Sequence, residues 1–216
     1  MREPEVHPAP APRPVGADLE ARLKVFEQVL LKWQPKMNLV APSTLKSIRI
    51  RHIEDSLQVA DIVPRAISWI DLGSGGGFPG IVTALRLQGE PGAMVHLVES
   101  DHRKCAFLRE VSRETQAPVE VHRGRIEDVL PTLPVVDAIS ARALASLSIL
   151  VEMTAERLES GALGVFLKGQ DVAAELTEMP IYSSLSIRLV ASRTDPLGRI
   201  VLLGRTDLVS TGGVGR

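Results

Sequence analysis

The sequence predicts an α/β fold: a mostly parallel, doubly wound sheet that ends in an antiparallel hairpin, preceded by a helical extension. Three observations predict it. From residue 67 onward, apolar runs of strand length alternate with segments of helical spacing, which is typical of parallel sheets. The first strand runs into a glycine-rich turn from Gly73 to Gly80, and such turns form ligand sites at the carboxyl ends of strands. The last two strands are joined by only seven residues, too few for a parallel crossover.

The region before residue 67 divides into a tail and a helical part. Residues 1–17 carry five prolines among alanines, so we expect a disordered tail there. Helical spacing of apolar residues predicts one helix with Asp18 as its N-cap and a second from Ser43 to about Val63. The predicted organisation is a tail (1–17), an N-terminal helical subdomain (18–66), an α/β domain (67–205) and a flexible, Ser/Thr/Gly-rich tail (206–216).

The α/β domain is predicted from short apolar runs and the helical segments between them. The expected strands are Ser68–Leu72, Met94–Glu99, Val119–His122, Val135–Ser140, Leu163–Lys168, Ser186–Ala191 and Arg199–Gly204. The expected helices lie near 79–88, 101–115, 145–159 and 169–179.

Composition excludes several classes of protein. No apolar run reaches the length of a transmembrane helix, and prolines stand where a signal peptide would carry its apolar core, so we expect a cytoplasmic protein. The single cysteine, Cys105, cannot form an internal disulfide and is expected to be a small buried side chain. No CxxC pair or closely spaced histidine cluster is present, so no metal site is predicted.

The glycine turn fits two cofactors. Gly75-x-Gly77-x-x-Gly80 matches the dinucleotide pattern, with Glu99 placed 19 residues later at a strand end. A start at Asp71 and Gly73 instead fits a loop around the amino-acid part of S-adenosylmethionine, with Glu99 accepting hydrogen bonds from both ribose hydroxyls. A carboxylate at this position serves either ligand. The turn alone therefore leaves a nicotinamide-dependent oxidoreductase and a methyltransferase open.

Further motifs carry a resemblance to a known family. They are Trp33, Met37–Leu39, Arg51–Ser56, Val98–Asp101, Phe107–Val111, Arg125–Glu127, Ser140–Ala143 and Phe166–Gly169. Together with the glycine turn, and in unbroken order over residues 19 to 204, they resemble the glucose-inhibited division protein B family, also called RsmG. Gln34 departs from the asparagine expected after the tryptophan, and this puts a detail of the helical extension in doubt.

The resemblance implies a Rossmann-like class I S-adenosylmethionine methyltransferase with an N-terminal helical extension. The implied activity is methylation of N7 of a guanine (guanine 527) in the 530 loop of bacterial 16S ribosomal RNA. The implied cofactor is S-adenosyl-L-methionine, released as S-adenosyl-L-homocysteine. The implied partner is 16S ribosomal RNA, the small ribosomal subunit or its precursor, and we expect a monomer. A non-catalytic RNA- or ligand-binding module with this fold is the remaining alternative.

The resemblance also implies site residues. The cofactor-binding set is Asp71, Gly73, Gly75, Phe78, Glu99, Ile126, Glu127 and Arg142, and Arg142 is also the implied catalytic residue. Asp71 either contacts the ligand or braces the loop. Lys168 and Arg51 are expected at the RNA, although Lys168 fits a solvated strand end equally well. His52 is expected to be a structural hydrogen-bonding residue.

The chemistry limits what Arg142 can do. Guanine N7 is a lone-pair nucleophile with no proton to lose, so no general base is required. Catalysis then depends on holding the reacting atoms in line. An arginine directly beside N7 would oppose the positive charge that develops on the purine. We therefore expect Arg142 to clamp guanine O6, a phosphate or the cofactor carboxylate.

Overall fold

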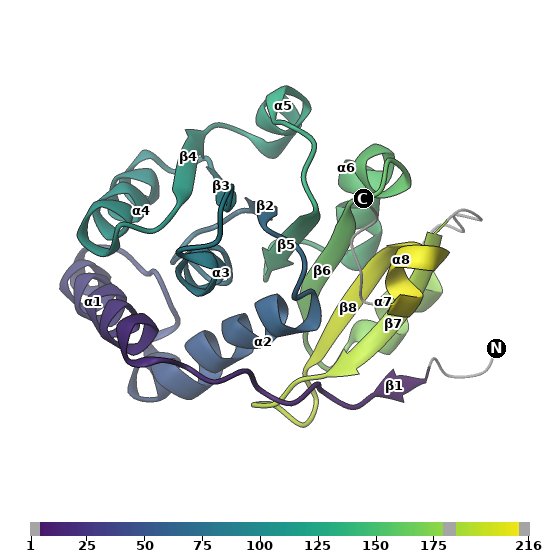
Figure 1. Cartoon of the computed structure of the whole chain (residues 1–216), viewed down its shortest axis with the longest axis horizontal. Helices are drawn as coiled ribbons and strands as arrows, with labels where there is room; N and C mark the ends of the chain where they lie inside the picture. Colours follow the sequence, from purple (N-terminus) through teal and green to yellow (C-terminus); the bar gives the residue numbers. More distant parts are fainter. Residues whose placement is uncertain (1–4, 179–184, 212–216) are drawn as a thin grey trace.

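The fold is built on one sheet, seen in a computed structural model that describes residues 5–178 and 185–211. The described strands are ordered β1-β7-β8-β6-β5-β2-β3-β4 (Figure 1). Strands β2 to β6 pair in parallel, whereas β8 is antiparallel to both β6 and β7. The predicted α/β class and the terminal hairpin are confirmed. The strands are β1 (Val6–His7), β2 (Ser68–Leu72), β3 (Met94–Glu99), β4 (Val119–Arg123), β5 (Ala138–Arg142), β6 (Leu163–Lys168), β7 (Leu185–Ala191) and β8 (Arg199–Arg205).

Helices cover both faces of the sheet because consecutive strand residues point to opposite sides. Trp69 belongs to the apolar core shared with α1 to α4, and its neighbour Ile70 to the core shared with α6 and α7. The N-terminal helices therefore pack into the same core as the sheet. The helices are α1 (Ala17–Trp33), α2 (Asp55–Ile62), α3 (Gly80–Leu87), α4 (His102–Thr115), α5 (Ile126–Val129), α6 (Leu147–Glu159), α7 (Val172–Glu178) and α8 (Thr206–Thr211).

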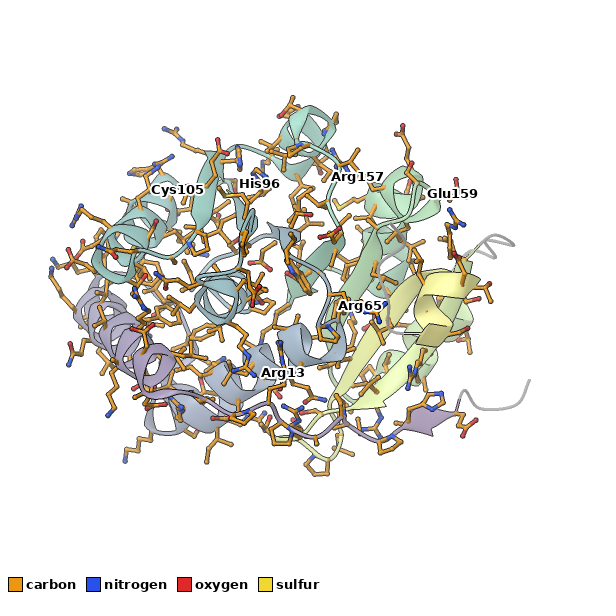
Figure 2. All side chains as sticks on the ribbon, in the orientation of Figure 1. Arg13, Arg65, His96, Cys105, Arg157 and Glu159 are labelled. Carbon is orange, nitrogen blue, oxygen red and sulfur yellow. The ribbon has the colours of Figure 1, made fainter. Side chains whose placement is uncertain are left out.

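The N-terminal segment corrects the prediction of a disordered tail as far as it is described. β1 pairs in parallel with β7, and the chain then crosses the bottom of the molecule as viewed in Figure 1. Arg13 (Figure 2) holds it there, because its Nε donates to Asp61 Oδ1 at 2.7 Å and Asp61 also pairs with Arg193 at 2.8 Å. The buried Asp61 carboxylate, paired with two arginines, thus fixes the N-terminal segment, which has too few apolar residues to form a core of its own. Residues 1–4 lie outside the described residues.

Two other boundaries differ from prediction. The segment expected as one helix from Ser43 is instead a 3₁₀ helix (Pro42–Ser47), a π-helix (Arg49–Glu54) and α2. β5 begins at Ala138 rather than at Val135, because the Asp137 carboxylate accepts hydrogen bonds from the backbone N–H groups of Ile67 and Ser68 at 2.9 and 3.0 Å. These hydrogen bonds fix Asp137 beside the start of β2, and the strand pairing of β5 begins at the next residue.

The end of the described chain is also ordered. Residues 206–211, predicted as part of a flexible tail, form α8, since Leu208 and Val209 are buried against the sheet. Residues 212–216 and the predicted helix end at 179 lie outside the described residues. Cys105 (Figure 2) is buried, as predicted.

Candidate active site

The glycine turn links β2 to α3 through backbone that only glycine adopts without strain. Gly73, Gly75 and Gly77 have φ values of 65°, 50° and 86°. The turn is closed by hydrogen bonds from the Ser74 N–H to the Val98 carbonyl (3.1 Å) and from the Gly77 N–H to the Ser74 carbonyl (2.7 Å). This shape brings main-chain atoms to the carboxyl ends of β2 and β3.

The helical extension fixes the far side of the turn. A Cβ atom at Gly76 would lie 2.7 Å from the Leu39 carbonyl oxygen. Leu39 in turn is positioned by Gln34, whose Oε1 accepts hydrogen bonds from the Leu39 and Val40 N–H groups and whose Nε2 donates to the Val40 carbonyl at 2.8 Å. Gln34 thus performs a bracing role in this chain, which answers the doubt about that position.

Glu99 is held in place by the turn itself. Its Oε2 accepts a hydrogen bond from the Gly75 N–H at 2.9 Å, and its Oε1 accepts one from the Asp101 N–H at 2.8 Å. Glu99 is only 7% exposed. The carboxylate is thereby oriented at the end of β3, and the remaining lone pairs of its oxygens can accept from a bound ligand.

A pocket of about 380 Å³ opens beside Glu99. It brings together four of the predicted cofactor residues: Gly73, Glu99, Ile126 and Glu127. Ile126 and Glu127 belong to α5, which follows β4. Other lining residues were not predicted as site residues: Ser100, Lys104, Ala143, Leu144, Ala145 and Met153. Ser100 and Ala143 lie in motifs that carry the family resemblance, whereas Met153 of α6 reaches the pocket through tertiary packing.

Asp71 and Phe78 lie behind this pocket and do not line it. Asp71 is fully buried, and the Ser140 hydroxyl donates to its Oδ1 at 2.7 Å. Burial raises the pKa of Asp71 to about 6, against the lowering effect of the Ser140 hydrogen bond. Phe78 packs between Phe26 and His52, with ring centroids 5.1 and 5.0 Å away. Both residues support the turn, whereas Gly75 contributes its N–H to Glu99.

His52 has a structural environment, as predicted. Its Nε2 lies 2.8 Å from Thr44 Oγ1, and its ring packs on Phe78. Burial, with the nearby positive charges of Arg142 and Arg51, lowers the pKa of His52 to about 4. The imidazole is therefore neutral at physiological pH.

A second pocket of about 270 Å³ adjoins the first, and Ala143 lines both. Ala143 has a left-handed φ of 51°, which turns the chain between the two pockets. Arg142 lines the second pocket. Its Nη2 donates to the Arg51 carbonyl at 2.7 Å and lies 3.5 Å from Asp55 Oδ2, while its buried Nη1 has no hydrogen-bond partner among the described residues.

The two predicted RNA-contacting residues also line the second pocket. Lys168 Nζ lies 2.6 Å from Glu175 Oε2 and donates to the Ala145 carbonyl at 2.9 Å. Arg51 Nη1 lies 3.1 Å from Asp195 Oδ2, and its side chain is partly exposed. Both cations are thus engaged within the protein, and of the two only Arg51 presents a substantial exposed surface.

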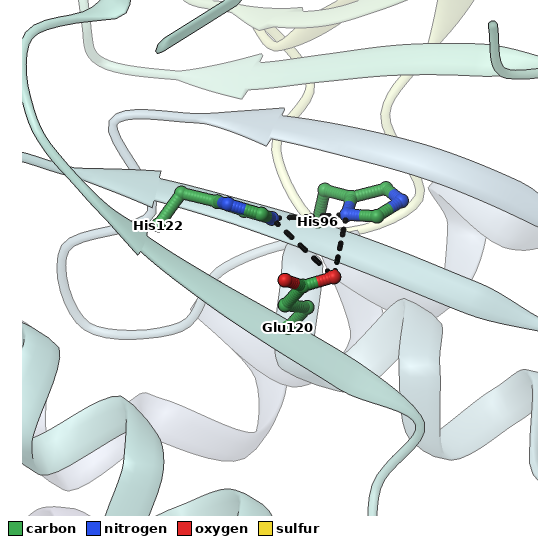
Figure 3. Close-up of side chains that lie close together, drawn as sticks. All are labelled: His96, Glu120 and His122. Carbon is green, nitrogen blue, oxygen red and sulfur yellow. Dashed lines mark hydrogen bonds and ion pairs between the residues drawn. The ribbon is translucent and has the colours of Figure 1, made fainter. Parts of the chain in front are cut away.

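Three potential metal ligands meet elsewhere on the sheet, against the expectation of no metal site. They are His96 on β3 and Glu120 and His122 on β4 (Figure 3). Sequence spacing did not reveal them because strand pairing brings them together.

Within the described residues, no helix is long and apolar enough to cross a membrane.

The first pocket fits an adenosine-type cofactor. The left-handed glycine turn leaves room that a Cβ atom would fill: at Gly73 that atom would lie 2.7 Å from Leu144 Cδ1. The oriented Glu99 carboxylate suits a ribose diol, and Ile126 offers an apolar surface for a base. Arg142 lines the second pocket, and its buried Nη1 has no hydrogen-bond partner among the residues that the structure describes.

Comparisons with known proteins agree with this geometry. The family described as "GidB: rRNA small subunit methyltransferase G" matches residues 19–192. The chain is 50% identical over 191 residues to "Ribosomal RNA small subunit methyltransferase G" of Bradyrhizobium sp. (strain ORS 278), covering 88% of this chain and 86% of the relative. It is 48% identical over 187 residues to a protein of that name from Methylorubrum extorquens, covering 87% of this chain and 89% of the relative.

Solved structures of methyltransferases share the fold. An O-methyltransferase from Bacillus cereus in complex with SAH aligns with a TM-score of 0.56 at 16% identity, over 89% of this chain and 92% of that one. The predicted class I methyltransferase fold is confirmed.

Proposed function

The chain belongs to the GidB family of ribosomal RNA small subunit methyltransferases G, and from that premise we propose how its two pockets divide the reaction. The protein is an S-adenosylmethionine-dependent methyltransferase of small-subunit ribosomal RNA. We propose that the pocket beside Glu99 binds the cofactor and that the pocket beside Arg142 receives a guanine of the 530 loop. The observation that carries this division is that the two pockets adjoin at Ala143.

The cofactor is held by main chain and by one oriented carboxylate. Glu99 would accept hydrogen bonds from the ribose hydroxyls, Ile126 would offer an apolar surface to the adenine, and Glu127 would supply polar groups at its edge. The backbone at Gly73, which lines the same pocket, would lie beside the amino-acid part. When bound, S-adenosylmethionine supplies an electrophilic methyl group.

Arg142 positions the guanine. Its Nη2 is tied to the Arg51 carbonyl and lies near Asp55, so the guanidinium plane is fixed at the wall of the second pocket. Its Nη1 is buried and has no hydrogen-bond partner among the described residues, so a substrate oxygen would reach this donor only after the groups that cover it move. A donor of this kind suits guanine O6 and leaves N7 free to react. Neutral His52 is then not needed as a base, because N7 carries no proton. The role of Arg142 is to orient the guanine. Holding N7 in line with the methyl group accelerates the transfer, because the reacting atoms are already close and aligned.

Two variants separate the pockets. Glu99→Gln is expected to weaken S-adenosylhomocysteine binding in calorimetry by tenfold or more. Arg142→Lys is expected to leave that affinity within about threefold and to slow methyl transfer to 16S RNA by tenfold or more. Glu114→Gln, on an exposed face of α4, is the control. Tight binding of NAD, or equal S-adenosylhomocysteine binding by wild type and Glu99→Gln, would contradict the assignment.

The same proposal covers partners and location. We expect a cytoplasmic monomer that acts on 16S RNA, free or within the small subunit or its precursor. The sheet edges support a monomer, because β1 is only two residues long and β4 carries charged side chains, both of which discourage edge pairing. Light scattering tests the mass. Methylation assays that compare free 16S RNA with the small subunit test the substrate, and transfer that occurs only with the subunit would identify the subunit as the substrate.

A further inference from the structure

A cluster of two histidines and one glutamate lies on paired strands outside both pockets. β3 and β4 are parallel neighbours, with His96 opposite Glu120 and Val98 opposite His122. Glu120 and His122 are two residues apart, so they share a face of β4. The three side chains point toward one another, as Figure 3 shows.

The distances suit a metal ion. His96 Nδ1 lies 3.0 Å from His122 Nε2, and Glu120 Oε2 lies 3.6 Å from the former and 3.9 Å from the latter. The point in the plane of these three atoms that is equidistant from them lies about 2.1 Å from each, which is the bond length of zinc to histidine nitrogen and carboxylate oxygen. Two imidazoles and one carboxylate are a ligand set that zinc takes in proteins.

A hydrogen bond between the two imidazoles alone does not explain the position of the Glu120 carboxylate. That bond needs one proton and two nitrogens, and the carboxylate is too far from either nitrogen to join it. Yet Glu120 Oε2 points to the space that both nitrogens face. We propose that His96, Glu120 and His122 bind a divalent transition metal ion of the zinc type, with the fourth position open to water.

The ion would tie an edge strand to its one neighbour among the described strands. β4 pairs there with β3 alone, and Gly124, two residues after His122, lines the cofactor pocket. A metal linking His96 to His122 restrains the strand that leads into this wall. The Glu120 side chain is 61% exposed, so an ion reaches the site from solvent.

The test uses the untagged full-length protein, stripped with a chelator and titrated with Zn²⁺ alone. Calorimetry is expected to give one ion per chain, and Co²⁺ in its place is expected to give the visible spectrum of a site with nitrogen ligands and low coordination. Each variant removes a ligand, so Glu120→Gln and His122→Gln should each weaken binding by about tenfold or more, at least as much as the loss of a residue that only supports a ligand. His102→Gln and Glu114→Gln, both on the exposed face of α4, should bind as wild type.

Stability provides an independent readout. Free Zn²⁺ at 100 times its Kd should raise the folded-to-unfolded ratio of wild type about 100-fold, and that of Glu120→Gln much less. Because Glu120 is exposed, its variant is expected to fold normally, which circular dichroism checks. Zinc binding that is absent, or that is equal in wild type, Glu120→Gln and His122→Gln, overturns the proposal. S-adenosylhomocysteine affinity of the same samples separates this outcome from failure of the cofactor pocket.

Discussion

Replacing Asp71 by asparagine removes a buried carboxylate from the base of the glycine turn. Asp71 is fully buried and accepts a hydrogen bond from the Ser140 hydroxyl at Oδ1. Burial raises the pKa of Asp71 from 3.8 to about 6, although the hydrogen bond from Ser140 acts to lower it. The folded protein therefore holds this proton more tightly than the unfolded chain does.

The sign and size of the effect follow from linkage. Below pH 3.8 both states are protonated and ionisation has no cost. Between that value and about pH 6 the unfolded chain loses the proton first, so the free energy of unfolding falls as pH rises. Above pH 6 the full cost of about 3 kcal/mol remains, since each pH unit corresponds to about 1.4 kcal/mol. Asp71→Asn has no such titration.

Denaturant unfolding at about pH 4, 5, 6 and 7 measures the difference between the two proteins. The stability of Asp71→Asn relative to wild type should rise by about 2 kcal/mol over this range. Ser140→Ala, which keeps the carboxylate but removes a hydrogen bond to it, should raise the pKa further and shift the fall in stability to higher pH. Parallel curves for wild type and Asp71→Asn would refute the reasoning.

Two further substitutions test how the N-terminal region supports the site. Gly76→Ala places a Cβ 2.7 Å from the Leu39 carbonyl oxygen, so we expect a loss of about 1–3 kcal/mol and weaker S-adenosylhomocysteine binding. Gly169→Ala, where the added atom meets open space, is the matched control, and equal effects in both would contradict the packing argument. Asp61→Asn leaves Arg13 and Arg193 without their carboxylate and should cost about 3 kcal/mol in thermal unfolding, whereas an unchanged midpoint would show that this network does not hold the N-terminal segment.

Local sequence signals were sufficient for strands β2 to β8 and for the glycine turn. Apolar runs of strand length and the glycines of the turn act over a few residues, so the strands and the position of Glu99 at the end of β3 were predictable. The terminal hairpin followed from the length of one loop. The pocket beside Glu99 then brings together Gly73, Ile126 and Glu127, although their roles toward the cofactor stay predictions.

Features set by distant contacts were not predictable. The N-terminal segment is fixed by Arg13 on Asp61, 48 residues away, and composition alone indicated disorder. Helical periodicity also predicted a regular helix through His52. In the structure that stretch is π-helical, and His52 contacts Thr44 and Phe78 there. Strand register decided whether His96 meets His122, which no spacing within either strand reveals.

The measurement that tests the central claim most directly is transfer of labelled methyl to 16S RNA followed by borohydride–aniline cleavage, which breaks the chain at N7-methylated guanine. The pairing of the Glu99 and Arg142 pockets predicts one new break, in the 530 loop, with wild type, and a much weaker break with Arg142→Lys. Cofactor binding without transfer would identify a non-catalytic module. A break elsewhere in the RNA would contradict the proposed guanine.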